Sequence, residues 1–498
     1  MKEKIEAFGL EQKPKTIKNK IPKSETGITG LDAITNGGIP KNKTTLVIGG
    51  IGCGKTFMGL EYIVNGIDRF NEHGVFMSFE ENSDELKANF ASLGFDLTQF
   101  IDEKKLYLEH LSLGPERIKE SGTYTIDGLF ARLAYAIDQV KAKRVVLDSL
   151  DTLFSQLNKD ILRLEFKRLF SWLKEKNVTA FITAERGENL LTRMGIEEWI
   201  ADCVIELDNR ITNQIGTRRI RILKYRGSNH SQNEYPFAIN DNGIVIFPII
   251  SEGIEQKSSP NRISTGIKKL DEMLSNKGFY AGSSILISGS SGTGKTSITC
   301  SFADSACRRH IRCLYCAFEE APNQIIRNML SIGLDLKHSV DAQYLNFYYA
   351  RPSLQNLELH FMAIKDVISY TNPEIIILDP ITNLMTEGPN SDVRSMLTRF
   401  IDYLKTKQIT VMFSAAITIG SISINPSDEG ISSMVDSWIM VEDIKVDKEL
   451  YRYIYIVKSR GMAHSKEVRE FVISDNGIDL KVFRKKKPHV NGALEGKS

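Results

Sequence analysis

Short apolar runs alternate with amphipathic stretches along most of the chain. The runs are rich in β-branched residues and uninterrupted, which is typical of strands buried on both faces of a parallel sheet. They are residues 45–48, 145–147 and 180–182, then 285–287, 375–378 and 411–413. Between them, apolar side chains recur at helical spacing over 162–176 and 393–407. Strands that alternate with helices predict an α/β fold whose mostly parallel sheets are flanked by helices.

The chain carries this pattern twice. Residues 26–32 (TGITGLD) return as 265–271 (TGIKKLD), and the Phe-Glu-Glu triplet of 79–81 returns at 318–320. Self-similarity that persists over several separate motifs indicates two copies of one structural unit. The sequence therefore predicts two homologous domains in tandem.

The domain boundaries are expected where both patterns lapse. Residues 251–260 (SEGIEQKSSP) are polar and contain Ser and Pro, which is typical of a linker. We therefore expect a first domain over 21–250 and a second over 261–484. The Lys-rich residues 1–20 are expected to form a flexible N-terminal segment, and 485–498 a basic C-terminal tail.

Composition excludes several classes of protein. Apolar residues make up 42% of the chain, and 64 basic residues nearly balance 62 acidic ones. No bulk attraction to nucleic acid or membrane is therefore expected. No apolar run approaches the roughly 18 residues of a spanning helix, and the N-terminus lacks the apolar region of a signal peptide. Six cysteines are too few for a disulfide framework, so we expect a cytoplasmic protein.

Two glycine-rich segments, 49–56 (GGIGCGKT) and 289–296 (GSSGTGKT), match the pattern G-x-x-x-x-G-K-[ST]. Each follows an expected strand and opens an expected helix, which is the context of a phosphate-binding loop. Glycines let backbone N–H groups surround phosphate oxygens, while Lys55 and Lys295 would reach the β- and γ-phosphates. The predicted ATP-binding residues are Gly49, Gly52, Cys53, Gly54, Lys55, Thr56, Gly289, Gly292, Thr293, Gly294, Lys295 and Thr296.

An acidic residue ends one buried run in each copy. Asp148 follows 145–147, and Asp379 follows 375–378. The carboxyl end of a buried parallel strand lies beside the phosphate-binding loop, where a carboxylate can orient the shell of Mg²⁺. We therefore expect both Asp residues at the nucleotide, with Thr56 and Thr296 as Mg²⁺ ligands.

Glutamate doublets follow another strand in each copy. They are Glu80-Glu81 and Glu319-Glu320. Hydrolysis or phosphoryl transfer needs a carboxylate that orients the attacking water or hydroxyl. We interpret all four as catalytic, with Glu319 also contacting Mg²⁺.

Paired cations lie far beyond each loop. Lys224 and Arg226, and later Lys458 and Arg460, are two positions apart at the end of an expected strand, so each pair faces one side. Two such cations can neutralise γ-phosphate charge, most simply on the nucleotide of a neighbouring subunit.

These motifs in this order resemble the KaiC family, the circadian-clock ATPase KaiC and its bacterial and archaeal relatives. The resemblance spans roughly residues 20 to 485. It implies two tandem RecA-like P-loop NTPase domains, stacked as two rings of a homohexamer with ATP and Mg²⁺ between subunits. It also implies slow ATP hydrolysis in the first ring, and autokinase, autophosphatase and ATPase activity in the second. The protein would then act as a clock-like or regulatory timer.

The resemblance assigns roles residue by residue. Glu80 and Glu81 match hydrolytic carboxylates, and Glu319 and Glu320 match kinase carboxylates. Ser432 and Ser433 match the adjacent phosphoacceptors, and Ser427 matches a transient acceptor. The positions that reach the nucleotide across the rings are matched by Lys224, Arg226, Ser228, His230, Arg452, Lys458, Ser459 and Arg460.

Partners follow from the same resemblance. A KaiB-like protein is expected on the first ring. The segment that the activator KaiA grips is not recognisable beyond Asp479, so KaiA is not expected as a partner.

Two other functions fit a RecA-like core. A nucleic-acid-dependent ATPase would carry basic or aromatic loops, whereas residues 380–392 contain no Lys or Arg. A nucleotide-gated signalling scaffold would lack kinase activity, and the retained glutamate doublets favour an enzyme instead.

Overall fold

The structure is a computed structural model of the chain. It describes residues 21–111, 127–149, 151, 159–187, 190–193, 195, 197–212, 215–240, 243–247, 259–352, 357–385, 390–416, 433–446 and 449–482. Almost all described residues before 250 form one compact unit, and those from 259 onward form a second.

The first unit is built on a twisted sheet. Its strands are β3 (Thr44–Gly49), β4 (Gly74–Ser78), β5 (Leu106–His110), β6 (Arg144–Asp148), β7 (Thr179–Glu185), β8 (Cys203–Thr212), β9 (Ile215–Tyr225), β10 (Glu234–Asn240) and β11 (Gly243–Ile246). Among the described residues these nine strands follow the order β11-β10-β9-β8-β3-β7-β6-β4-β5. The pairs from β5 to β8 are parallel, and β9, β10 and β11 pair antiparallel. A two-stranded ribbon, β1 (Lys23–Ser24) with β2 (Ile39–Pro40), precedes the sheet.

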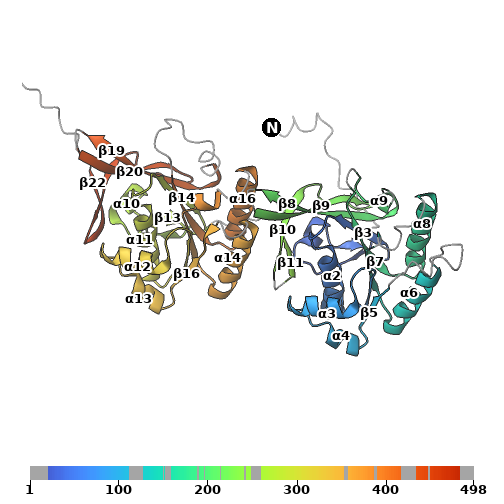
Figure 1. Cartoon of the computed structure of the whole chain (residues 1–498). Coiled ribbons are helices and arrows are strands. Elements are labelled where there is room, and N and C mark those ends of the chain that lie inside the picture. The colour runs from blue at the N-terminus through green and yellow to red at the C-terminus, as the bar shows by residue number, and fades with distance from the viewer. Residues whose placement is uncertain are drawn as a thin grey trace, which may run out of the picture. The chain divides into compact units, whose positions relative to one another are not determined.

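Helices cover both faces of this sheet (Figure 1). They are α1 (Leu31–Ile34), α2 (Lys55–Phe70), α3 (Ser83–Ala91), α4 (Thr98–Asp102), α6 (Asp127–Val140), α8 (Lys159–Glu175) and α9 (Glu197–Ile200). Alternate strand residues feed two separate cores: Val47 and Phe181 pack on the α2 side, and Leu46 and Ile182 on the side of α6 and α8. The prediction of strands buried on both faces is thereby confirmed.

The second unit repeats the architecture. Its strands are β14 (Ser284–Gly289), β15 (Cys313–Ala317), β16 (Leu345–Tyr349), β17 (Ile375–Asp379), β18 (Thr410–Ala416), β19 (Ser437–Val446), β20 (Glu449–Ser459), β21 (Arg469–Ser474) and β22 (Gly477–Val482). Within the described part, these nine strands follow the order β16-β15-β17-β18-β14-β19-β20-β21-β22. The first six are parallel and the last three continue antiparallel. The ribbon of β12 (Arg262–Ile263) and β13 (Phe279–Tyr280) corresponds to β1 and β2.

The helices of the second unit also lie on both faces of its sheet (Figure 1). They are α10 (Lys268–Met273), α11 (Lys295–Cys307), α12 (Pro322–Leu330), α13 (Leu336–Asp341), α14 (Leu357–Thr371), α15 (Thr382–Met385) and α16 (Asn390–Thr406). The helices expected over 162–176 and 393–407 are α8 and α16, each shifted by a few residues. The α/β class with mostly parallel, helix-flanked sheets is confirmed in both units.

Within the residues that the structure describes, no helix combines the length and the apolar character needed to cross a bilayer.

Candidate functional site

The first glycine-rich segment forms a loop between β3 and α2. Gly52 and Gly54 have φ values of 71° and 99°, a region that residues with a side chain rarely adopt. A Cβ atom on Gly54 would also come within 2.7 Å of Ile239 Cδ1. The glycines therefore allow the loop to curl at the N-terminus of α2, where unpaired backbone N–H groups attract anions.

Lys55, Thr56 and Asp148 meet at this loop. The Lys55 ammonium donates hydrogen bonds to the carbonyls of Gly49 (2.9 Å) and Gly50 (3.0 Å). Thr56 Oγ1 donates to Asp148 Oδ2 at 2.8 Å. Burial raises the pKa of the Asp148 carboxyl, and hydrogen bonds from Thr183 and Thr56 oppose that rise. This pairing of hydroxyl and carboxylate oxygens fits Mg²⁺, which binds hard oxygen ligands.

The glutamate doublet of the first unit is held at the end of β4. Ser149 Oγ donates to Glu80 Oε1 at 2.5 Å, which fixes Glu80 next to Asp148. Asn89 Nδ2 donates to Glu81 Oε2 at 3.2 Å. Both carboxylates therefore stand at the strand edge that carries the loop, as predicted from the sequence.

The second loop has the same backbone. Gly292 and Gly294 have φ values of 81° and 86°. The Lys295 ammonium donates to the carbonyls of Gly289 (2.8 Å) and Ser290 (2.7 Å). Burial lowers the pKa of Lys295, while Asp379 and Glu319 act in the opposite direction.

The acidic residues of the second unit have different partners. Tyr315 donates to Asp379 Oδ2 at 2.5 Å, and Ser414 donates to Asp379 Oδ1. Asn328 Nδ2 donates to Glu320 Oε2 at 3.0 Å, as Asn89 does to Glu81. The residue after Asp379 is Pro380, so this unit has no hydroxyl equivalent to that of Ser149 at that position.

The predicted cation pair of the first unit caps a short helix. Lys224 Nζ donates to the carbonyls of Glu198 (2.9 Å) and Trp199 (3.1 Å), and Arg226 Nη2 donates to Trp199 O at 2.9 Å. Burial lowers the pKa of Lys224, and the neighbouring Arg226 lowers it further. The two cations thus converge on the C-terminal end of α9, on one side of the strand as expected.

The second unit repeats part of this arrangement. Arg460 Nη2 donates to Ser433 O at 2.8 Å. Arg452 Nη2 donates to Gly292 O, in the phosphate-binding loop, at 2.9 Å. Sequence reasoning missed the counterpart of Arg452 in the first unit, which is Arg218, whose Nη2 lies 3.5 Å from Gly52 O. The repeat could have identified it, because both arginines precede their Lys-x-Arg elements by six positions.

The remaining predicted residues lie around these elements. Ser228 bonds to the adjacent Asn229 carbonyl, and the His230 ring stacks on Tyr225. Ser459 is buried, with its hydroxyl 2.7 Å from that of Ser437. Ser427 and Ser432 lie outside the described residues.

Matching backbone hydrogen bonds show that the residues just before Asp436 correspond to those just before Asp202, which include α9. Asp202 N donates to Thr44 O, and Asp436 N donates to Ser284 O in the same way. Arg226 N and Arg460 N then donate to the carbonyls of these two Asp residues. Counting back from Asp202 and Asp436, Glu198 corresponds to Ser432, and Trp199 corresponds to Ser433. By this count, the first unit has Glu198 at the sequence position where the second has Ser432.

Sequence reasoning also missed a carboxylate at the end of β7. Glu185 pairs in register with Gly49 of the first loop, and its N–H donates to Asp151 Oδ2 at 2.5 Å. The equivalent residue of the second unit is Ala416, which pairs with Gly289. A comparison of the two copies could have found this difference.

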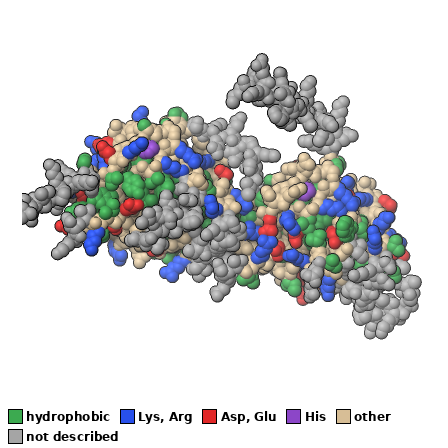
Figure 2. Space-filling view, turned by 90° about the horizontal axis from the view of Figure 1, so that it is seen from above, with side chains coloured by type: hydrophobic (Ala, Val, Ile, Leu, Met, Phe, Trp, Pro, Cys, Tyr) green, Lys and Arg blue, Asp and Glu red, His purple; other side chains and the backbone are tan. Residues whose placement is uncertain are grey.

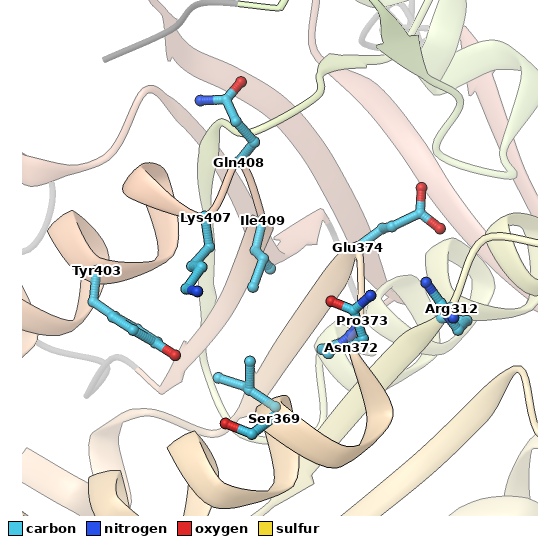
Figure 3. Close-up of a pocket in the computed structure, with 10 residues that line it drawn as sticks. Arg312, Ser369, Asn372, Pro373, Glu374, Tyr403, Lys407, Gln408 and Ile409 are labelled. Carbon is cyan, nitrogen blue, oxygen red and sulfur yellow. The ribbon is translucent and has the colours of Figure 1, made fainter. Parts of the chain in front are cut away.

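A cavity of about 400 Å³ opens in the second unit, away from its loop (Figure 3). Its walls include Tyr403, Lys407, Ser369 and Arg312. It lies where β17 and β18 begin, whereas the phosphate-binding loop follows the end of a parallel strand. None of the predicted site residues lines it.

Comparison with known proteins agrees with this geometry. A family model described as "ATPase: KaiC" matches residues 24–251 and 263–486. The chain is 46% identical over 461 residues to "Circadian clock protein KaiC2" of Synechocystis sp., covering 92% of this chain and 81% of the relative. It is 36% identical over 466 residues to "Circadian clock oscillator protein KaiC" of Synechococcus elongatus, covering 93% and 89%.

Two phosphate-binding loops on homologous α/β units, each beside a strand-end aspartate, define a tandem P-loop ATPase. The family match extends over both units, and the relatives are aligned over most of their length. The chain belongs to the KaiC family of ATPases.

Proposed function

We propose that the chain binds MgATP in both units, hydrolyses it mainly in the first and phosphorylates its own Ser432 and Ser433 in the second. It would work in the cytoplasm as a homohexamer with nucleotide between subunits, as a regulatory timer. The observation that carries the proposal is the replacement of Glu198 by a serine at an otherwise equivalent position of the second unit. A serine at this position, in a unit that also carries a phosphate-binding loop, supports a self-directed kinase that acts between copies of the chain.

In each unit the chain supplies the groups that MgATP needs. The loop N–H groups and Lys55 or Lys295 would hold the phosphates, and Thr56 with Asp148, or Thr296 with Asp379, would hold Mg²⁺. Bound Mg²⁺ would offset the negative charge of the β- and γ-phosphates. Arg218 and Arg452 reach the loop carbonyls from the same subunit and brace its backbone.

In the second unit, Glu319 and Glu320 would accept the proton of the serine hydroxyl. The serine Oγ would then bond to the γ-phosphorus while the bond to the β-phosphate oxygen breaks, and ADP leaves. Lys295 offsets the negative charge on the phosphates. In the first unit, Glu80 and Glu81 would orient a water molecule in place of the serine.

Exposed apolar side chains at opposite edges of the first sheet support association between copies, because Ile51 follows the end of β3 and Trp199 precedes the start of β8. Ile51 of the loop is 91% exposed, and Trp199, next to Lys224 and Arg226, is 73% exposed. Tryptophan is enriched among the residues that dominate binding at protein interfaces. A second copy with its phosphate-binding loop against Trp199 would bring its nucleotide toward this cation pair. A KaiB-like protein on the first ring is proposed from family membership alone.

The charge distribution gives a nucleic-acid motor no support. Basic and acidic side chains are interspersed on the face seen in Figure 2. A nucleic-acid groove would instead need a continuous basic track.

Intact-mass measurement with phosphosite mapping tests the proposal. Purified protein is incubated with MgATP beside a Ser432→Ala/Ser433→Ala variant. Species heavier by about 80 Da per phosphate, absent from the variant, are expected. Phosphate release without any mass shift would refute the autokinase and leave an ATPase switch or scaffold. Hydrolysis that requires added DNA or RNA would instead favour the nucleic-acid-dependent ATPase.

A further inference from the structure

The two aspartates at the phosphate-binding loops are held by different donors. Ser414 in the second unit replaces Thr183 of the first, and both donate to the Oδ1 atom. The Oδ2 atoms differ: Asp148 accepts from Thr56, while Asp379 accepts from Tyr315. The donor to Oδ2 has therefore moved from the loop helix to a neighbouring strand.

Tyr315 occupies the place of Phe76. Phe76 lies opposite Val146 in the pairing of β4 with β6, and Tyr315 lies opposite Ile377 in the pairing of β15 with β17. Both side chains are fully buried. The core of the second unit thus contains one phenolic hydroxyl that the first unit lacks. Tyr315 lies two residues before the end of β15, as Phe76 does in β4.

That hydroxyl belongs to a buried network. It lies 2.9 Å from Thr299 Oγ1 and accepts from Cys300 Sγ at 3.7 Å, while it donates to Asp379. A buried carboxylate with two such donors is strongly held, because losing either leaves an unpaired oxygen.

This change of donor affects Thr296, the loop threonine of the second unit. In the first unit the Thr56 hydroxyl donates a hydrogen bond to Asp148, which leaves the lone pairs of its oxygen available to a cation. Among the described residues, Thr296 makes no corresponding bond to Asp379. In the second unit the Oδ2 atom of Asp379 is instead held by Tyr315.

We propose that Tyr315 is a positioning residue that holds Asp379 away from Thr296 and weakens Mg²⁺ binding in the second site relative to the first. The inference rests on the proposed binding of MgATP in both units. The exchange of Phe76 for Tyr315 then gives two otherwise similar loops different requirements for Mg²⁺.

Nucleotide binding followed against Mg²⁺ concentration tests this in the full chain. Trp172→Phe/Trp199→Phe leaves Trp438, whose indole is bonded to Ser288 of β14, as the single tryptophan. Energy transfer from Trp438 to a fluorescent ATP analogue then reports the second site without any turnover. The half-saturating Mg²⁺ concentration is measured with and without Tyr315→Phe.

Tyr315→Phe is expected to lower the half-saturating Mg²⁺ concentration about fivefold, because Asp379 Oδ2 would then pair with Thr296. Tyr370→Phe, at an exposed tyrosine of the same unit, is the matched control and should leave it unchanged. Phe76→Tyr in a Trp438→Phe chain should raise the value for the first site. The affinity for the analogue is also measured without Mg²⁺. An effect on Mg²⁺ binding leaves this affinity unchanged, whereas damage to the fold lowers it.

An unchanged Mg²⁺ requirement in Tyr315→Phe would overturn the inference, as would an equal loss of affinity with and without Mg²⁺. The proposed function is distinguished by a separate readout. If the chain binds the analogue with Mg²⁺ but never becomes phosphorylated, the kinase proposal fails and the role of Tyr315 stands. If the second site binds no analogue at all, both fail.

Discussion

The first and second sites share a loop and differ where their strands end. Lys55 and Lys295 make the same two bonds to loop carbonyls, and Glu81 and Glu320 each accept from an asparagine eight positions on. The differences lie in side chains around this constant frame. They are Phe76 against Tyr315, Ser149 against Pro380, and Glu185 against Ala416. A further difference, Glu198 against Ser432, precedes the start of β8 and of β19 in the sequence.

The direction of these differences is informative. The first site has one additional carboxylate, Glu185 at the end of β7, and a serine whose hydrogen bond holds Glu80 beside Asp148. Side chains held in this way are suited to orienting one small nucleophile, such as a water molecule. The second site has Ala416 in place of Glu185. At the opposite edge of the same sheet, the backbone carbonyl of Ser433 accepts from Arg460. The two copies have therefore kept the phosphate-binding loop and differ in side chains around it. Under the proposed function, these are the groups that would determine what receives the phosphoryl group.

The largest expected effect is on the kinase carboxylates. Glu320→Gln should reduce phosphoserine formation about 10³-fold, because the amide cannot accept the serine proton. Phosphate release by the first site should continue. Mapping of phosphopeptides together with a phosphate assay measures both. Glu320→Asp is the control that keeps the carboxylate, and it should retain more activity than Glu320→Gln.

Glu81→Gln should have the opposite effects on phosphate release and on phosphoserine formation. Steady phosphate release is expected to fall by a similar factor, while phosphoserine still forms on the second unit. The proposed division of roles between the two units would be contradicted if Glu81→Gln removed phosphoserine and left hydrolysis intact.

A smaller effect concerns the stability of the first unit. Glu61 of α2 accepts from the Ile244 N–H at 2.8 Å, and burial raises its pKa to about 7. Its counterpart in the second unit is Ser301. Because the folded pKa exceeds the unfolded one, Glu61 stabilises the fold less as pH rises from about 4.5 to about 7.

Glu61→Gln should therefore remove about 3 kcal/mol of pH-dependent destabilisation between pH 4.5 and pH 7. The amide oxygen can still accept from Ile244. Urea unfolding in a Trp438→Phe chain follows the first unit alone through Trp172 and Trp199. Asp68→Asn, at an exposed position of the same helix, is the control. An equal pH dependence in Glu61→Gln and the parent chain would contradict the assignment.

The smallest effect is expected for the cation pair. Arg226→Ala should slow hydrolysis about tenfold, because Lys224 remains to offset part of the phosphate charge. Arg210→Ala, which removes a surface arginine paired with Glu234, should change hydrolysis little. Light scattering checks that both variants keep the assembly of the parent. A normal rate in Arg226→Ala would argue against a role at the neighbouring nucleotide.

The local motifs were predictable because their chemistry is contiguous in sequence. The loops, the strand-end Asp148 and Asp379, and the parallel strands follow from spacing and from apolar runs. Contacts across the sheet were not predictable in this way. Tyr315 meets Asp379 only because β15 and β17 are neighbours, and Lys224 finds Trp199 only through the tertiary fold. Arg218 and Glu185 could have been found by aligning the two copies of the repeat, because such an alignment needs no knowledge of the fold.

The central claim is that the second site phosphorylates the chain while the first hydrolyses ATP. The most direct test measures phosphoserine at 432 and 433 and released phosphate in the same samples of parent and Lys295→Ala protein. The account predicts that Lys295→Ala abolishes phosphoserine and retains most of the phosphate release. Phosphoserine that persists in Lys295→Ala would contradict it, because the phosphoryl group would then come from another site.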